Sequence, residues 1–251
     1  SMKKVLLKGP VLTRSGYGEQ ARFALRSLWS RPDLYDVYIA PTNWGKTSWT
    51  VEIDDERQMI DNVINKTTQY IQSGGKFDMS VQVTIPNEWE RLAPYNVGYT
   101  AGIETTRVAP EWIEKTNIMD KVVVVSNHAK NVFEQSNYLL QNGDKPPIPF
   151  EPTTAIDVVN YPVKNYESVD LGLQLDYDFN FLCIAQWGPR KNVKNTVKGF
   201  VEEFHDDEVG LVVKMFRAKN CHMDKLLCFE KLKELLSDYP DRKCKVHLIH
   251  G

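Results

Sequence analysis

The feature that most constrains the fold is a short apolar run that leads directly into an amphipathic helix pattern, within residues 179–204. The run covers 181–185, and Gly188 and Pro189 then form a turn. After the turn, apolar residues recur on one face of a 3.6-residue period. These stripe residues are Val193, Val197, Phe200, Val201 and Phe204. The pattern predicts a strand, a tight turn and a helix, which open a new α/β unit late in the chain.

The same alternation runs through the rest of the sequence. Short apolar segments at 5–7, 37–40, 78–85, 96–103 and 121–125 predict strands. Helix patterns follow at 17–29, at 52–72, from Pro110 and after Ser126, which is placed to cap its helix. Continuous apolar strands separated by helices are typical of a parallel sheet covered on both faces. The sequence therefore predicts an α/β fold with Rossmann-like parallel sheets.

The character of the chain changes between about 140 and 178, where prolines accumulate and a polar linker follows at 164–178. A length of 251 residues fits two ordinary domains. We expect a first domain over 1–165 and a partial second domain over 166–251. The second domain is predicted to contain strands at 179–185, 209–216 and 245–250, and helices at 191–205 and 222–238.

Composition excludes several classes of protein. The net charge of −2 gives no general attraction to nucleic acid or to an anionic membrane. The longest aliphatic run, 122–125, is far shorter than the roughly 20 residues of a transmembrane helix. The four cysteines form no CxxC pair, and no metal site is expected. We expect a cytoplasmic protein with no transmembrane segment.

Arg190 and Lys191 lie where the predicted strand of the second domain passes into its helix. Helix N-termini attract anions, so two cations there oppose the helix dipole unless an anion binds between them. The pair either holds a phosphate group or forms a solvated helix start. Lys214, in the next strand, lies at the same sheet edge or is simply solvated.

A glycine-containing loop follows the first predicted strand. Gly16 and Gly18 flank Tyr17 there, and glycine allows close approach of backbone N–H groups to a phosphate or sugar. Ala21 occupies the position of the third glycine of a GxGxxG fingerprint, which disfavours dinucleotide binding. The loop is either a ligand loop or a tight turn without a ligand.

Three further residues follow strands on the edge where ligands bind to parallel sheets. Glu104 is either a substrate hydroxyl acceptor or a loop carboxylate paired with Arg107, and Thr105 lies beside it. Trp89 either stacks on a sugar or packs in the core. These residues are the candidates for acceptor or sugar contact, together with Tyr17.

Two stretches carry a resemblance to a known family. Residues 97–138 contain a strand, Glu-Thr, Pro-x-Trp, Asp-x-Val and a Ser before a helix, and residues 179–200 contain the strand, basic turn and helix described above. In this order they resemble the glycosyltransferases of the GT-B type, in particular glycosyltransferase family 4. The resemblance covers nearly the whole chain.

The resemblance implies transfer of a sugar from a nucleotide-diphosphate donor to a hydroxyl of a glycan, lipid or small-molecule acceptor, without metal or cofactor and with retention at the anomeric carbon. The first domain would meet the acceptor, and the second would bind the donor. Lys191 matches the lysine that pairs with the diphosphate, and Gly16 and Gly18 match the loop that approaches it. The family has an arginine where this chain has Gln186, so either Arg190 takes its place or the donor diphosphate is bound more weakly.

The family's pair of glutamates would fall after Gly251, so we expect a truncated second domain and a 251-residue chain that is inactive by itself. Two other classes stay open. One is a nucleotide-sugar epimerase or a phosphorylase on the same fold, and the other is a non-catalytic module that binds a glycan or a nucleotide. Detection of sugar transfer, or of a released free epimer, would separate these classes.

Overall fold

The first unit is built on a six-stranded sheet in which every neighbouring pair is parallel. A computed structural model describes residues 1–251, and they divide into a first unit (1–45 and 49–164) and a second unit (46–48 and 165–251). The strand order is β2-β1-β3-β4-β5-β8. The strands are β1 (Lys3–Gly9), β2 (Tyr35–Pro41), β3 (Met79–Val83), β4 (Tyr95–Tyr99), β5 (Lys121–Val124) and β8 (Ile156–Val158). The predicted α/β class with a parallel sheet is confirmed.

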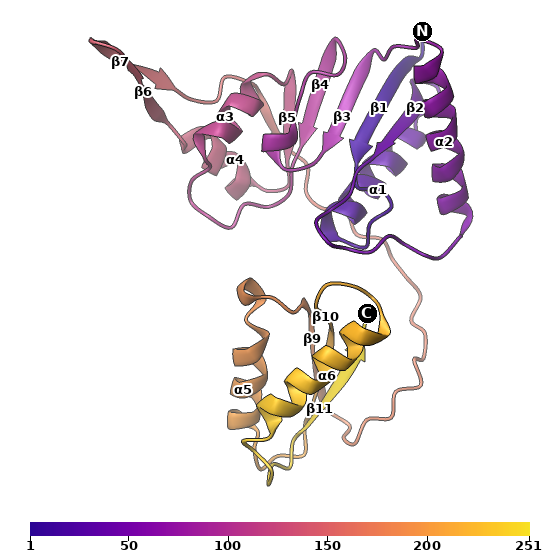
Figure 1. Ribbon diagram of the computed structural model, residues 1–251, viewed down its shortest axis with the longest axis vertical. Coiled ribbons are helices and arrows are strands. Elements are labelled where there is room, and N and C mark those ends of the chain that lie inside the picture. Colours follow the sequence, from indigo (N-terminus) through magenta and orange to yellow (C-terminus); the bar gives the residue numbers. More distant parts are fainter. The chain divides into compact units, whose positions relative to one another are not determined.

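The strand order reverses at β1. The chain passes from β1 to β2 on one side and then returns to β3 on the other side of β1 (Figure 1). Connections that leave neighbouring strands in opposite directions open a crevice at the carboxyl ends of those strands. The loop after β1 therefore begins at this switch point.

Three of the four helices of the first unit begin at side-chain caps that the sequence specifies. The helices are α1 (Gly16–Trp29), α2 (Asp55–Gln72), α3 (Pro110–Asn117) and α4 (Asn127–Gln135), and a 3₁₀ turn, η1 (Pro86–Glu88), follows β3. Ser15, Asp54 and Ser126 each accept a hydrogen bond from a backbone N–H three residues later. Such caps satisfy N–H groups that have no partner within the helix.

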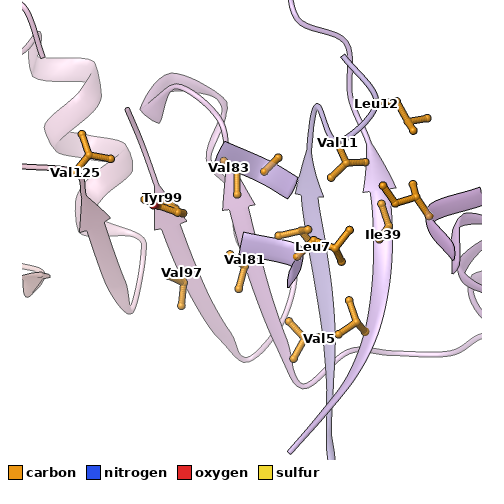
Figure 2. Close-up of a cluster of buried hydrophobic side chains, with 14 residues drawn as sticks. Val5, Leu7, Val11, Leu12, Ile39, Val81, Val83, Val97, Tyr99 and Val125 are labelled. Atoms are coloured by element: carbon orange, nitrogen blue, oxygen red, sulfur yellow. The ribbon is translucent and has the colours of Figure 1, made fainter. Parts of the chain in front are cut away.

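Alternate residues of the central strands enter two separate cores. One core lies on the face that α1 covers, and Figure 2 shows its strand residues. Its members include Val5, Leu7, Val81, Val83, Val97 and Tyr99, together with Ala21 and Leu25 of α1. The other core contains Val122, Val124 and Ile156 with Ile113 of α3 and Phe133 of α4. Burial on both faces explains why the strands read as continuous apolar runs.

A β-hairpin occupies part of the stretch in which the sequence predicts only loops. Strands β6 (Tyr138–Asn142) and β7 (Lys145–Phe150) pair antiparallel, and Gly143 has φ +59° in the turn between them. The three prolines of β7 argue against a strand in a central position. A two-stranded ribbon has only edge strands, so these prolines are tolerated.

The second unit has a three-stranded parallel sheet in the order β11-β10-β9. Its elements are β9 (Asn180–Gln186), η2 (Pro189–Lys191), α5 (Val193–Glu203), β10 (Gly210–Phe216), α6 (His222–Leu236) and β11 (Lys245–His250). Four residues of the stripe predicted for α5 are buried as expected, and the fifth, Phe204, is partly buried at the end of the helix. The helix begins at Val193 and not at 191. In β9, Leu182 and Ile184 are 64% and 66% exposed, so the prediction of burial on both faces is wrong for this edge strand.

No helix of the structure is both long enough and apolar enough to cross a membrane.

A close contact inside the first unit gives a test of its packing. The fully buried indole of Trp89 lies on Gly98 of β4, and a Cβ atom at 98 would come within 2.7 Å of that ring. We expect Gly98→Ala to lower the free energy of unfolding by about 1–3 kcal/mol, because the rigid ring must move. Gly102→Ala is the matched control, since its Cβ atom would have 3.9 Å to its nearest neighbour. Equal urea midpoints for the two variants would contradict this packing.

Candidate functional site

The loop after β1 is held in a fixed shape by hydrogen bonds from α1 and from its own side chains. Thr13 Oγ1 donates to the Pro10 carbonyl at 3.0 Å, and Ser15 Oγ accepts from the Gly18 N–H at 2.9 Å. Arg22, further along α1, donates to the carbonyl of Thr13 at 2.9 Å. These bonds fix the loop at the switch point, where a parallel sheet offers its ligand crevice.

The two glycines of this loop differ in what they allow. Gly18 is buried, and a Cβ atom there would lie 2.2 Å from the Thr13 carbonyl oxygen, so only glycine fits. Gly16 is exposed, and a Cβ atom there would meet no atom within 4 Å. Gly18 therefore approaches the chain itself closely, whereas Gly16 borders open space. The predicted contact of both with a diphosphate stays a prediction.

Tyr17 joins the start of α1 to the end of β4. Its hydroxyl lies 3.0 Å from Thr100 Oγ1 and accepts a hydrogen bond from the Ala101 N–H at 3.1 Å. Its ring stacks on Trp44, with ring centroids 4.1 Å apart. Burial raises the pKa of the Tyr17 phenol above its ordinary value, although the bonds to Thr100 and Ala101 oppose that shift. Tyr17 is thus a neutral, half-buried residue at the ligand edge.

Two buried polar side chains at this edge carry an atom without a partner in the protein. Gln20 is 2% exposed; its Nε2 donates to the Thr100 carbonyl at 3.0 Å, but its Oε1 has no partner. Thr84 follows β3, is 1% exposed and has an unpartnered hydroxyl. The pairing of β3 with β4 ends at Val83 and Tyr99, and Thr84 and Thr100 are the next residues of the two strands. Buried polar groups nearly always have partners, so this edge fits an ordered water or a ligand hydroxyl.

These residues were missed at the level of sequence. A signal is present, because Thr84 and Thr100 directly follow β3 and β4, at the carboxyl ends where ligands bind to parallel sheets. Gln20 gives no such signal, since a glutamine in the second turn of a helix is ordinarily solvated.

The loop after β4 contains Glu104 and Thr105, both exposed. Thr105 Oγ1 donates to the carbonyl of Arg107 at 2.8 Å. The guanidinium of Arg107 donates to the Asn137 carbonyl at 2.8 Å and lies over the ring of Tyr138 at 4.3 Å from its centroid. Both candidate residues thus sit on the loop predicted for them, and their contact with an acceptor stays a prediction.

Trp89 has no exposed surface, because it packs among Val108, Ile113 and Val122 in the second core of the first unit. The prediction of a sugar contact for Trp89 is wrong for this reason. The other reading of the sequence, a core residue, is the one observed.

The basic pair of the second unit lies between β9 and α5, in the segment that links the strand to the helix. Arg190 and Lys191 are exposed residues of the 3₁₀ turn η2, which precedes α5. Asn192 then adopts the left-handed region with φ 50° and ψ 39°, and its side chain makes no capping hydrogen bond. Asparagine tolerates this region better than most residues. The first N–H groups of α5 therefore lack a side-chain cap at the place where both cations lie.

Lys214 is half-buried in β10, and its ammonium group donates to the Gly251 carbonyl. Gln186, at the end of β9, donates to the Arg217 carbonyl at 2.9 Å. Both side chains link neighbouring strands at the carboxyl edge of the sheet. The predicted contact of Lys214 with a diphosphate stays a prediction.

The similarity of this chain to known proteins is weak. No protein-family model and no curated protein sequence matches this chain. Among solved structures, MurG of Acinetobacter baumannii overlaps 98% of this chain at a TM-score of 0.42 and 10% sequence identity. The aligned part is 66% of the MurG chain, slightly under two thirds of its length. A TM-score this low carries no argument about fold or function.

The two glycines of the loop provide a matched pair of variants. Gly18→Ala should destabilise the fold by about 3 kcal/mol or more, because the new methyl group would overlap the Thr13 backbone. Gly16→Ala should change stability by no more than about 0.5 kcal/mol, because its methyl group meets open space. Urea unfolding followed by circular dichroism measures both. A stable Gly18→Ala variant would show that the loop has a different conformation.

The unpartnered hydroxyl of Thr84 gives a second test. Thr84→Val removes a buried polar group that has no partner in the protein, so stability should stay unchanged or rise by up to about 1 kcal/mol. The control is Thr116→Val, because the buried Thr116 hydroxyl donates to the Trp112 carbonyl at 2.7 Å. That variant should lose about 1 kcal/mol. Equal losses in the two variants would mean that the Thr84 hydroxyl has a structural partner.

Proposed function

We propose that this chain belongs to a glycosyltransferase of the GT-B type, which moves a sugar from a nucleotide-diphosphate donor to an acceptor hydroxyl. The observation that carries the proposal is the switch point of the first unit, where a fixed loop meets buried polar atoms that lack partners. The first unit would contact the acceptor, and the second would bind the donor. The family resemblance of residues 97–138 and 179–200 supports the same assignment.

The first unit offers the chemistry that a sugar needs. Hydroxyl groups both donate and accept hydrogen bonds, which the Gln20 carbonyl oxygen and the Thr84 hydroxyl can complement. The stacked rings of Tyr17 and Trp44 add an apolar surface beside them. The open space next to Gly16 admits a phosphate to the start of α1. A ligand with hydroxyl groups therefore fits this edge better than a purely apolar one.

The second unit offers the chemistry that a diphosphate needs. Arg190 and Lys191 place two cations beside the uncapped N-terminus of α5. Backbone N–H groups and the helix dipole favour negative charge there. During transfer, negative charge grows on the leaving diphosphate, so fixed positive groups at this turn would stabilise the transition state. We assign the donor diphosphate to this turn, with retention at the anomeric carbon as the finer proposal.

The alternative classes are separated by their products. A transferase joins the sugar to an acceptor, an epimerase releases a changed sugar, and a phosphorylase needs inorganic phosphate. A non-catalytic module binds its ligand and leaves it unchanged. A panel of nucleotide sugars, incubated with acceptors and with inorganic phosphate and analysed by chromatography with mass spectrometry, distinguishes these outcomes, because epimers share a mass but differ in retention.

Lys191 gives the sharpest test of the donor site. Lys191→Ala should weaken the binding of a nucleoside diphosphate by roughly 1.5–3 kcal/mol, the scale of a charge-assisted hydrogen bond. Its stability should hardly change, because the side chain is exposed. Lys194→Ala, on an exposed position of α5 itself, is the control and should bind normally. Equal affinities of wild type and Lys191→Ala in calorimetric titrations would remove Lys191 from the donor site.

A further inference from the structure

Three buried side chains of different chemistry meet near the carboxyl edge of the second sheet. Asp224 and Cys228 lie one turn apart on α6, and His250 ends β11. Their carboxylate, thiol and imidazole ligand atoms all lie within 4.8 Å of one another. Asp224 and Cys228 are 5% and 0% exposed, and the side chain of His250 is 5% exposed. We call this group the Asp-Cys-His cluster.

We propose that the Asp-Cys-His cluster binds one divalent transition metal ion and that Zn²⁺ is the ion it suits. Zn²⁺ accepts oxygen, sulfur and nitrogen ligands together, whereas Mg²⁺ and Ca²⁺ require oxygen. This inference goes beyond the proposed function and does not depend on it. The sequence predicts no metal site, because its cysteines form no CxxC pair, and that prediction did not consider these three residues together.

The separation of the nitrogen and oxygen ligand atoms fits a tetrahedral ion. His250 Nε2 and Asp224 Oδ2 lie 3.2 Å apart. Two ligand atoms at about 2.0–2.1 Å from Zn²⁺ and at the tetrahedral angle are roughly 3.3 Å apart, so an ion fits against both with little movement. Cys228 comes from the helix turn after Asp224, on the same helix face. Two residues at i and i+4 of one helix, together with one residue of another element, thus supply three ligands.

The carboxylate of Asp224 is already held by the backbone. It accepts hydrogen bonds from the N–H groups of Arg217 at 2.9 Å and of Ala218 and Lys219 at 3.3 Å each. Such outer contacts fix a ligand in place before the ion arrives. They also keep the carboxylate ionised, as a metal ligand must be.

Binding requires two proton changes. Cys228 loses its thiol proton to solvent as the sulfur–metal bond forms, and His250 carries its remaining proton on Nδ1 so that Nε2 faces the ion. The ligands then contribute two negative charges, which the dication neutralises. A buried carboxylate and a buried thiolate are costly without such compensation.

Three protein ligands leave one tetrahedral position for another group. His250 also lines a cavity of about 540 Å³, whose wall includes Asn220, Cys221, His222 and Lys225. Zinc sites that keep an open position bind water or a substrate group there. We assign the fourth position to a water or an anionic ligand that enters from this cavity.

Cobalt provides the test, because Co²⁺ replaces Zn²⁺ and reports its ligands by colour. The full chain is freed of metal with a chelator and then titrated with Co²⁺. We expect one Co²⁺ per chain, intense visible bands of tetrahedral geometry, a near-ultraviolet thiolate-to-cobalt band, and displacement by Zn²⁺. Cys228→Ser should lose the thiolate band, and it and His250→Ala should each lower the affinity for Zn²⁺ by about tenfold or more.

Cys244→Ser is the matched control, because Cys244 is equally buried in the same unit but lies outside the cluster. Near-ultraviolet circular dichroism of each variant shows that it is folded, and His250→Ala stands in if Cys228→Ser is not. The proposal is overturned if the folded wild type binds no Co²⁺, or if Cys228→Ser keeps the thiolate band. No nucleotide sugar enters the assay, so either result leaves the glycosyltransferase proposal to its own tests.

Discussion

The parallel pairing of β1 with both β2 and β3 determines where every candidate residue of the first unit lies. Parallel strands bring all their carboxyl ends to one edge, and a central strand with neighbours on both sides opens a crevice there. The loop after β1, the end of β3 and the end of β4 consequently meet at one place. A different register or direction of β1 would separate them, whatever their individual residues.

The edge is then made specific by contacts between α1 and β4. Tyr17 and Gln20 lie on the first two turns of α1. The Tyr17 hydroxyl bonds to the Thr100 hydroxyl and to the Ala101 N–H, and the Gln20 amide donates to the Thr100 carbonyl. The start of α1, which follows β1, is thereby bonded to the end of β4, and β4 lies two strands away from β1 in the sheet. Such ties position the loop more precisely than the loop's own residues could, because a surface loop alone has few long-range contacts. The conformation of the candidate site thus depends on the sheet as well as on the glycines.

The hydrophobic periodicity of the sequence was enough to predict the helices and the strands of the two parallel sheets. That periodicity follows from which side chains face a core. The α5 stripe and the strands of both sheets follow directly from apolar residues that face a core. The β6–β7 hairpin could not be predicted, because its prolines signal a loop unless the ribbon is known to have free edges. Trp89 was ambiguous for a related reason, since only the folded structure brings its ring against Gly98 of β4, nine residues later in the chain. The Asp-Cys-His cluster depends on the pairing of β10 with β11, which no local spacing encodes.

The second unit places two kinds of charge on one edge of one sheet. Arg190 and Lys191 lie after β9, and the carboxylate of Asp224 lies in the first turn of α6, which follows β10. A negative residue in a first helical turn is favourable by itself, so the dipole of α6 accounts for Asp224. The thiol of Cys228 and the imidazole of His250 lie beside this carboxylate and would supply the other two ligands of a metal ion. A dication bound there would neutralise the carboxylate and the thiolate, so that the positive charges of Arg190 and Lys191 would no longer be opposed by Asp224. The metal site and the diphosphate turn are separate proposals. A dication bound at the metal site would nevertheless favour the binding of an anionic diphosphate at the turn.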